Sequence, residues 1–111
     1  PLYGYQWETL GNTPRAGIIP GTGITASNSR VEELISTCST CSASFDKTAM
    51  ESYLIYKDTE TDTFHQLFYP DKESTLAKTK FAIEQNLGGI GLWALGYEGS
   101  TILEPLKDYI K

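Results

Sequence analysis

Apolar and polar residues alternate at the start of the chain, and this pattern predicts a strand over Leu2–Trp7. Successive side chains of a strand point to opposite faces, so Tyr3, Tyr5 and Trp7 should share one face of the sheet. The residues between these rings should lie on the opposite face. The segment therefore predicts a strand with an aromatic side.

The next part of the chain reads as a loop followed by a short helix. Residues 11–27 are rich in Gly, Pro, Thr and Ser, which predicts a loop with one short strand around Gly17–Ile19. Ser29 and Glu32 have the spacing of a capping box, in which each side chain binds a free backbone N–H of the first helical turn. We therefore expect a helix over Arg30–Thr37.

Three further strands are expected in the middle of the chain. The segments Ala43–Asp46, Glu51–Lys57 and Thr63–Tyr69 are rich in β-branched and aromatic residues. The polar stretch Asp58–Asp62 separates the last two segments. Because this spacing suits a hairpin loop, Glu51–Lys57 and Thr63–Tyr69 should pair antiparallel.

After Pro70 the apolar period changes from that of a strand to that of a helix. Asp71 is placed to cap this helix, and Gly88–Gly89 should end it in a left-handed turn. The positions that follow the 3.6-residue period are Leu76, Thr79, Lys80, Ile83 and Leu87. This face of the helix is therefore expected to pack on the protein.

The final segment begins with the apolar run GIGLWAL, Gly89–Leu95, which lacks polar alternation. Such a run is typical of a strand covered on both faces, as in a parallel sheet. An amphipathic helix over Thr101–Ile110 should follow it. The overall fold class is therefore α+β, and its outer elements should form a parallel β-α-β unit. Since such a unit needs more sheet than these strands provide, we expect further strands upstream of Pro1.

The composition limits the domain count and the class of partner. With 111 residues, of which 40% are hydrophobic, the chain is long enough for one domain. The net charge is −5 and no run of Lys and Arg occurs, which argues against nucleic acid and against an anionic membrane surface. No apolar segment approaches the roughly 20 residues of a membrane span.

The two cysteines, Cys38 and Cys41, form a single C-x-x-C motif. A structural zinc site needs two more ligands, and His65 is the only histidine of the chain, so we expect no metal and no cofactor. A thioredoxin-type motif should open a helix directly after a strand, whereas these cysteines follow a predicted helix. A local disulfide and two unreactive thiols both remain open.

Four motifs together resemble the C-terminal part of the family 18 glycoside hydrolases, which are chitinase-like enzymes. The motifs cover nearly the whole chain and are Pro1-x-Tyr3-Gly4-x-x-Trp7, Phe45-Asp46 followed by Tyr53-x-x-Tyr56, Tyr69-Pro70-Asp71 with Ser74 and Lys78, and Leu87-Gly88-Gly89-x-x-x-Trp93-Ala94-Leu95. The resemblance implies that residues 1–7 are barrel strand seven and that residues 8–70 are an α+β insertion domain. Residues 71–111 would then be the last barrel helix, strand and helix.

The resemblance also implies a function. The catalytic D-x-x-D-x-D-x-E motif of the family and its Tyr-Asp pair do not occur in this sequence, so no catalytic residue is expected here. The chain resembles the substrate-binding part of a hydrolase of N-acetylglucosamine-containing polysaccharide, either chitin or peptidoglycan. The alternative is a non-catalytic carbohydrate-binding relative. Such polymers imply export or association with the cell wall, and bare barrel edges should favour self-association.

Five residues are expected to bind substrate. In the family, the tryptophan that matches Trp93 forms the floor of the sugar pocket, whereas the sequence alone also allows an aromatic core residue. Tyr3 matches a pocket-lining tyrosine, and Tyr5 stands where many chitinases have an arginine. Trp7 either lines the cleft or packs under the insertion. Glu33 either matches a glutamate that reaches the substrate or is a solvated helix carboxylate.

Overall fold

The computed structural model describes residues 1–109 and shows an α+β fold, which confirms the predicted class. One five-stranded antiparallel sheet has the strand order β2-β1-β5-β4-β3. Its strands are β1 (Tyr3–Thr9), β2 (Ile24–Ser27), β3 (Ser42–Asp46), β4 (Glu51–Asp58) and β5 (Thr63–Tyr69). The helices within these residues are α1 (Asn28–Thr37), α2 (Lys72–Glu84) and α3 (Leu106–Tyr109).

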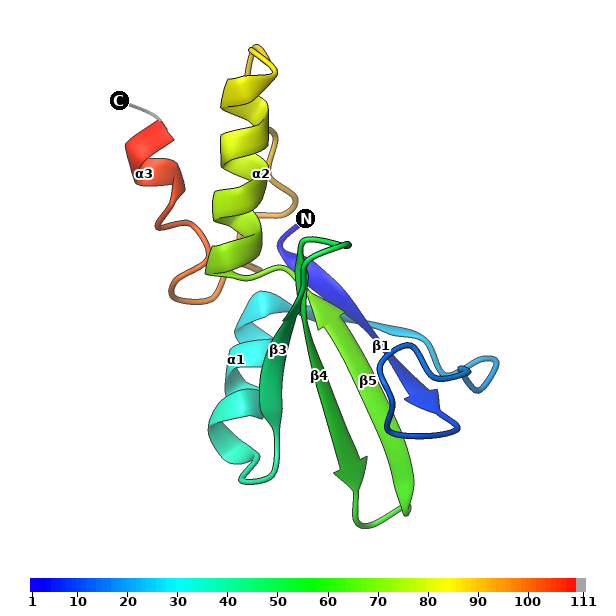
Figure 1. Cartoon of the computed structure of the whole chain (residues 1–111). Coiled ribbons are helices and arrows are strands. Elements are labelled where there is room, and N and C mark those ends of the chain that lie inside the picture. The colour runs from blue at the N-terminus through cyan, green and yellow to red at the C-terminus, as the bar shows by residue number, and fades with distance from the viewer. Residues whose placement is uncertain (110–111) are drawn as a thin grey trace.

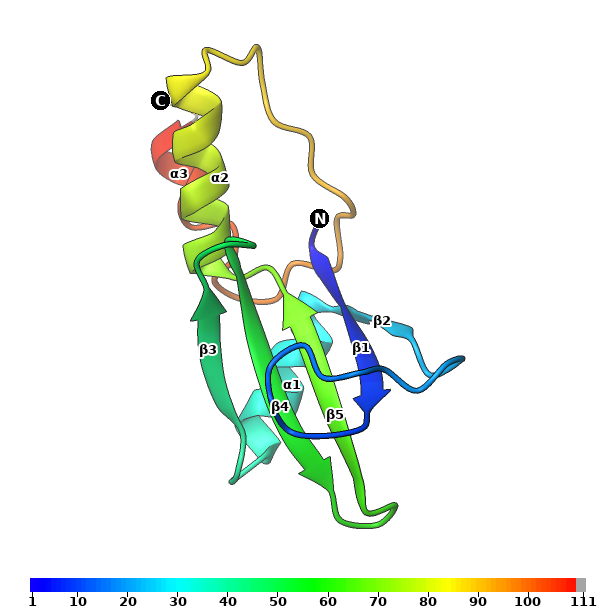
Figure 2. The same ribbon diagram turned by 45° about the vertical axis from the view of Figure 1, so that its right-hand side comes forward.

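The two faces of the sheet are covered by different parts of the chain (Figure 1). Helix α1 lies against one face, and the loop between β1 and β2 lies over the other, as Figure 2 shows from a second side. The main core lies under α1 and consists of Ala26, Val31, Leu54, Leu67 and Tyr69. On the opposite face, the loop forms hydrogen bonds with the buried Gln66 side chain. The Gln66 amide nitrogen donates to the Thr13 carbonyl oxygen at 2.6 Å, and its amide oxygen accepts from the Arg15 N–H.

Strand β1 has the predicted two-residue period. Its Gly4 and Gln6 are buried, whereas Tyr3, Tyr5 and Trp7 lie on the other face and are partly or largely exposed. Gly4 is required by packing, because a Cβ atom here would lie 2.2 Å from the carbonyl oxygen of Phe68 on β5. The close approach of β1 to β5 thus depends on the absence of a side chain.

Helix α1 begins earlier than predicted, and the prediction of a capping box formed by Ser29 and Glu32 is wrong. Ser27, not Ser29, is the N-cap, and its hydroxyl accepts a hydrogen bond from the Arg30 N–H. The Glu32 carboxylate instead accepts the backbone N–H of Ser100, with both oxygens within 3.0 Å. The local spacing suits a capping box, but a backbone donor distant in sequence takes this carboxylate.

Helix α2 has the predicted N-cap but a different end and a different buried face. The Asp71 carboxylate accepts from the Ser74 N–H, as expected. The left-handed residue after the helix is Asn86, with φ 51°, so the stop predicted at Gly88–Gly89 is wrong. The helix buries Ser74, Thr79 and Ala82, and most of the expected face is exposed, including Leu76, Ile83 and the following Leu87.

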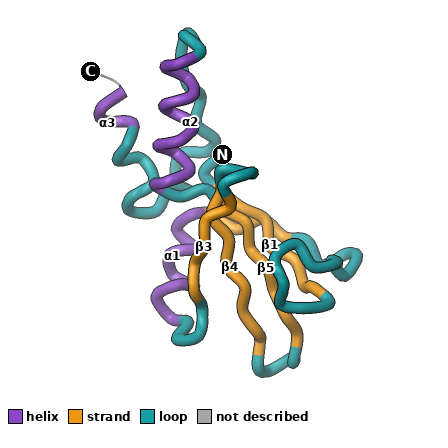
Figure 3. Tube along the Cα trace, viewed as in Figure 1, coloured by secondary structure: helices purple, strands orange, loops and turns teal. Residues whose placement is uncertain are grey.

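The predicted strand Gly89–Leu95 is wrong, because this segment forms a loop (Figure 3, teal). A strand needs backbone hydrogen bonds along a paired edge. This segment instead has one such contact with the N-terminal end of the chain among the described residues, in which the Leu2 N–H donates to the Trp93 carbonyl oxygen at 2.7 Å. The parallel β-α-β unit expected from this strand does not form either, since β1 pairs antiparallel with β2 and β5.

The last predicted helix, Thr101–Ile110, is also too long. Residues 101–105 form turns with i→i−3 hydrogen bonds, and α3 begins only after Pro105, which lacks a backbone N–H. Ile110 lies outside the described residues. The short strand expected around Gly17–Ile19 is reduced to an isolated bridge between Thr9 and Ile18.

The two cysteines are bonded to each other in this structure. Cys38 and Cys41 form a disulfide that links the end of α1 to the start of β3, which decides between the two predicted states. Within residues 1–109, no group of three or more His, Cys, Asp or Glu side chains is arranged to hold a metal ion. No helix in this part of the chain has the length and apolar character needed to cross a membrane.

Candidate functional site

Four aromatic rings form a row along β1 and the loop that follows α2. Tyr5 stacks on Trp7 with centroids 5.7 Å apart, and Tyr3 meets Tyr5 edge to face at 5.9 Å. Tyr97, from the loop, meets Tyr3 edge to face at 6.4 Å. Because the rings support one another, their positions are set before any ligand arrives.

An open cavity of about 390 Å³ lies beside this row, and we call it the aromatic cavity. Its lining residues come from β1, β2, α1 and the Trp93 loop and are Tyr3, Tyr5, Thr25, Ser27, Arg30, Trp93 and Tyr97. The register of β1 and β2 places Tyr3 opposite Ser27 and Tyr5 opposite Thr25. The pairing therefore sets hydroxyl groups beside aromatic rings on the same face of the sheet.

Trp93 contributes an exposed indole to the aromatic cavity. The side chain is 71% exposed, which excludes its role as a core residue in this structure. Its loop is held at several points by backbone atoms, including the bond from Leu2 to Trp93 and one from the Ser29 N–H to the Tyr97 carbonyl oxygen at 3.1 Å. The peptide bond between Trp93 and Ala94 is cis. The backbone hydrogen bonds thus hold the loop in place while the indole ring stays largely exposed.

The bonds of Glu32 hold the same loop against α1. Gly99 has φ +65°, and a Cβ atom at this position would lie 2.7 Å from a carboxylate oxygen of Glu32. The close approach and the positive φ both favour glycine here. The segment with Trp93 and Tyr97 is therefore fastened to the helix that contributes Arg30 to the cavity.

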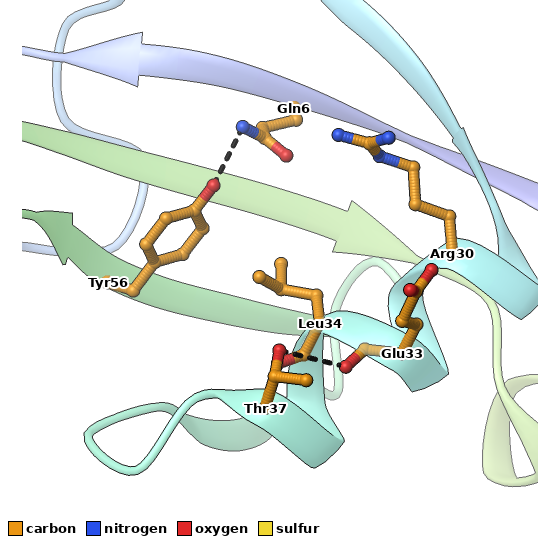
Figure 4. Close-up of a pocket in the computed structure, with 6 residues that line it drawn as sticks. All are labelled: Gln6, Arg30, Glu33, Leu34, Thr37 and Tyr56. Atoms are coloured by element: carbon orange, nitrogen blue, oxygen red, sulfur yellow. Dashed lines mark hydrogen bonds between the residues drawn. The ribbon is translucent and has the colours of Figure 1, made fainter.

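A second, more polar cavity of about 260 Å³ shares Arg30 with the first. Figure 4 shows the residues that line it. It is lined by Gln6, Arg30, Glu33, Leu34, Thr37 and Tyr56, and we call it the polar cavity. The Gln6 amide donates to the Tyr56 hydroxyl at 2.8 Å. Tyr56 also stacks on His65, with centroids 5.1 Å apart. Burial, followed by the charge of Asp58, raises the pKa of the Tyr56 hydroxyl, so Tyr56 is a neutral hydrogen-bonding group near neutral pH.

The five predicted residues are distributed over separate places. Tyr3, Tyr5 and Trp93 line the aromatic cavity, and Glu33 lines the polar cavity. Trp7 lines neither cavity but stacks on Tyr5 beside the loop between β1 and β2. The geometry leaves the binding role of each residue as a prediction.

Sequence reasoning missed three kinds of lining residue. Arg30 lines both cavities, Tyr97 extends the aromatic row, and Thr25 and Ser27 add hydroxyl groups. The alternation of polar residues in β2 could have indicated the hydroxyls, but the loop was predicted to contain no strand there. The approach of Tyr97 depends on a contact between distant segments, for which a single sequence gives no signal.

The side chains around the two cavities suit the binding of a carbohydrate. Flat apolar rings cover the C–H face of a sugar, and hydroxyl, amide and guanidinium groups bind its oxygens. Among the described residues that line these two cavities, Glu33 is the only carboxylate.

Comparison with known proteins identifies relatives over most of the chain. The chain is 33% identical over 98 residues to the cortical fragment-lytic enzyme of Bacillus subtilis (strain 168), a match that covers 86% of this chain and 20% of the relative. The chain thus spans about a fifth of the length of this curated relative. No protein-family model matches the chain.

Solved structures with the same fold cover nearly the whole chain. The spore cortex-lytic enzyme SleL of Bacillus megaterium QM B1551 matches with a TM-score of 0.76 and 26% identity, over 96% of this chain and 23% of that one. A chitinase of Chromobacterium violaceum ATCC 12472 matches with a TM-score of 0.76 and 22% identity, over 99% of this chain and 31% of that one. A glycoside hydrolase family 18 N-acetylglucosaminidase of Paenibacillus barengoltzii gives 0.74 and 22%, over 96% and 31%. These matches confirm the resemblance that the motifs indicate.

Proposed function

We propose, from the premise that this chain is a relative of the family 18 glycoside hydrolases, that it is the substrate-binding part of such an enzyme. Its substrate would be an N-acetylglucosamine-containing polysaccharide, either chitin or peptidoglycan. The observation that carries the proposal is the aromatic cavity, in which the exposed indole of Trp93 stands beside Tyr3, Tyr5 and Tyr97.

Two further observations support a carbohydrate ligand. The relatives are named as cortex-lytic enzymes, chitinases and an N-acetylglucosaminidase, and these names indicate enzymes that act on sugar polymers. The aromatic cavity and the polar cavity share Arg30 in their linings. Their rings, hydroxyls, amide and guanidinium groups suit the faces and oxygens of sugars.

The proposal assigns a role to each predicted residue. Trp93 stacks on a sugar ring, Tyr3 and Tyr5 line the pocket beside it, and Glu33 accepts hydrogen bonds from sugar hydroxyls in the polar cavity. Trp7 acts by supporting Tyr5, on which it stacks. The division into residues 1–7, 8–70 and 71–111 likewise belongs to the proposal, as does export of the protein or its association with a cell wall.

The alternative function is carbohydrate binding without cleavage, and the exposed Trp93 supports both functions equally. We expect the 111-residue chain to bind sugar without hydrolysing it, because the catalytic motif of the family does not occur in its sequence. A general acid typically contributes on the order of 100- to 10,000-fold to the rate of such a reaction. Binding therefore has to be measured separately from catalysis.

The test uses the purified chain with chitotetraose and an aryl chitobioside. We expect calorimetric titration to detect saturable binding of chitotetraose, and release of the chromophore to stay at the level of a denatured control. Cellotetraose is the matched control sugar, because it lacks the N-acetyl groups. No saturable binding would contradict the substrate-binding role, and release of the chromophore would contradict the expected lack of catalysis.

A further inference from the structure

Residues 91–100, which include Trp93 and Tyr97, have little packing of their own. No residue of this segment is buried, and the nearest buried side chain after it is Ile102. Figure 2 shows the segment in orange between α2 and α3, where it passes the start of β1. Because few buried apolar contacts hold such a segment, its position depends on its hydrogen bonds.

The hydrogen bonds between this segment and the rest of the described chain are of two kinds. Backbone N–H groups donate to the carbonyl oxygens of Trp93 and Tyr97. The other contact comes from a side chain, since the carboxylate oxygens of Glu32 lie 2.9 and 3.0 Å from the Ser100 backbone nitrogen. Among the described residues, no other side chain outside the segment is hydrogen-bonded to it, so a single substitution removes this kind of contact.

The Glu32 contact is close in sequence to the rings of the aromatic cavity. Tyr97 lies three residues before Ser100, and its backbone N–H donates to the Ala94 carbonyl oxygen at 3.1 Å. Ala94 directly follows Trp93, and both Trp93 and Tyr97 line the cavity. A short series of bonded residues therefore joins the Glu32 carboxylate to both rings.

Glu32 itself is not among the described residues that line either cavity. Its side chain is half-buried in α1, and both of its carboxylate oxygens face the same backbone N–H. Such a contact requires an acceptor oxygen but not a negative charge. Glu32 can therefore affect ligand binding in the cavity through the segment that it holds.

We propose that Glu32 is a positioning residue for sugar binding, because it holds Tyr97 and Trp93 at the aromatic cavity before a ligand arrives. This inference rests on the proposed function. Without the contact, the segment occupies the binding arrangement for only a fraction of the time, and the apparent affinity falls by that fraction although both rings are still present.

The first test is calorimetric titration of the 111-residue chain with chitotetraose. Glu32→Ala should weaken binding about tenfold, which is near the lower end of the contribution of a hydrogen bond to a charged group. Glu32→Gln should stay within about twofold of the wild type, because its amide oxygen can accept the same N–H. Glu84→Ala is the matched control, since it removes an exposed carboxylate from the last residue of α2, and it should bind as the wild type does.

The second test needs no ligand and follows the two tryptophans of the chain, Trp7 and Trp93. Labelling with 5-fluorotryptophan gives each indole its own fluorine NMR signal, and Trp7→Phe assigns them. Glu32→Ala should shift or broaden the Trp93 signal, leave the Trp7 signal in place and change the midpoint of urea unfolding little. A general loss of structure would instead alter both signals and lower the midpoint.

The outcomes distinguish the inference from the proposed function. If Glu32→Ala binds chitotetraose as the wild type does, or leaves the Trp93 signal unchanged, the positioning role is refuted while sugar binding stands. An equal loss of affinity in Glu84→Ala or in Glu32→Gln would also refute it, because charge rather than the contact would then explain the effect. If the wild type does not bind chitotetraose, the proposed function fails, and the Trp93 signal alone then decides whether Glu32 positions the ring.

Discussion

Replacing Trp93 with alanine should weaken oligosaccharide binding strongly and destabilise the protein only slightly. The indole is 71% exposed beside Tyr3 and Tyr97 in the aromatic cavity, so most of its surface is free to contact a ligand. The substitution thus removes contacts that form on binding rather than contacts that form on folding. The two effects can be measured on the same variant.

The exposed fraction of the indole sets both magnitudes. A fully covered aromatic side chain buries roughly 150 to 250 Å², at about 25 cal/mol per Å². Trp93 is 71% exposed, so a ligand that covered all of this exposed surface would gain about 3 to 4 kcal/mol of binding free energy. A sugar covers one face of the ring, and about half of this value corresponds to a ten- to thirtyfold change in affinity. The part already buried accounts for about 1 to 2 kcal/mol of stability at most.

Isothermal titration with chitotetraose measures the first effect, and urea unfolding measures the second. Leu95→Ala is the matched control, because Leu95 is 78% exposed in the same loop but does not line the aromatic cavity. It should leave the affinity unchanged. If Trp93→Ala kept its affinity, or lost about 3 to 5 kcal/mol of stability as a truncated core tryptophan does, the reasoning would be refuted.

Three further predictions concern the fold. Gly4→Ala should destabilise the chain by more than about 2 kcal/mol in urea unfolding, because its Cβ atom would meet the Phe68 carbonyl oxygen at 2.2 Å. Gly11→Ala is the matched control and should cost less, because a Cβ atom at Gly11 would meet no atom within 4 Å. Burial, followed by the charge of Asp71, raises the pKa of Tyr69 to about 12. The contribution of Tyr69 to stability is complete below the unfolded pKa of about 10 and is lost as the pH rises through about 12. The free energies of unfolding of the wild type and of Tyr69→Phe should therefore depend differently on pH only between about pH 10 and 12. Finally, the exposed apolar side chains of α2 and the loop after it should cause self-association, which sedimentation at rising concentration would detect; a monomer throughout would contradict this.

The sequence predicted well those elements whose signal is local. The alternation in β1 identified the aromatic face because a strand turns successive side chains to opposite sides whatever it pairs with. Asp71 was correctly identified as a helix cap, since the capping bond to Ser74 lies within one turn. The polar loop Asp58–Asp62 likewise identified the hairpin of β4 and β5 from neighbouring residues alone.

The errors occurred where a partner distant in sequence decides the structure. Glu32 has the spacing of a capping box, but its carboxylate binds the Ser100 N–H, which no local pattern indicates. The apolar run Gly89–Leu95 has the composition of a buried strand, yet a strand forms only when its backbone groups are paired. The candidate site was predicted in part for the same reason: its rings were visible in the sequence, whereas the approach of Arg30 and Tyr97 depends on tertiary contacts.

The bond between Glu32 and Ser100 has a consequence for the design of hybrid proteins. Because the two residues are 68 positions apart, the helix and the Trp93 loop cannot be exchanged independently between relatives. A donor segment that lacks an acidic residue at position 32 would leave the Ser100 N–H without its acceptor, and a side chain at position 99 would collide with the carboxylate. Transplanting either segment thus requires transplanting both, so the smallest exchangeable piece is larger than any single element of the sheet.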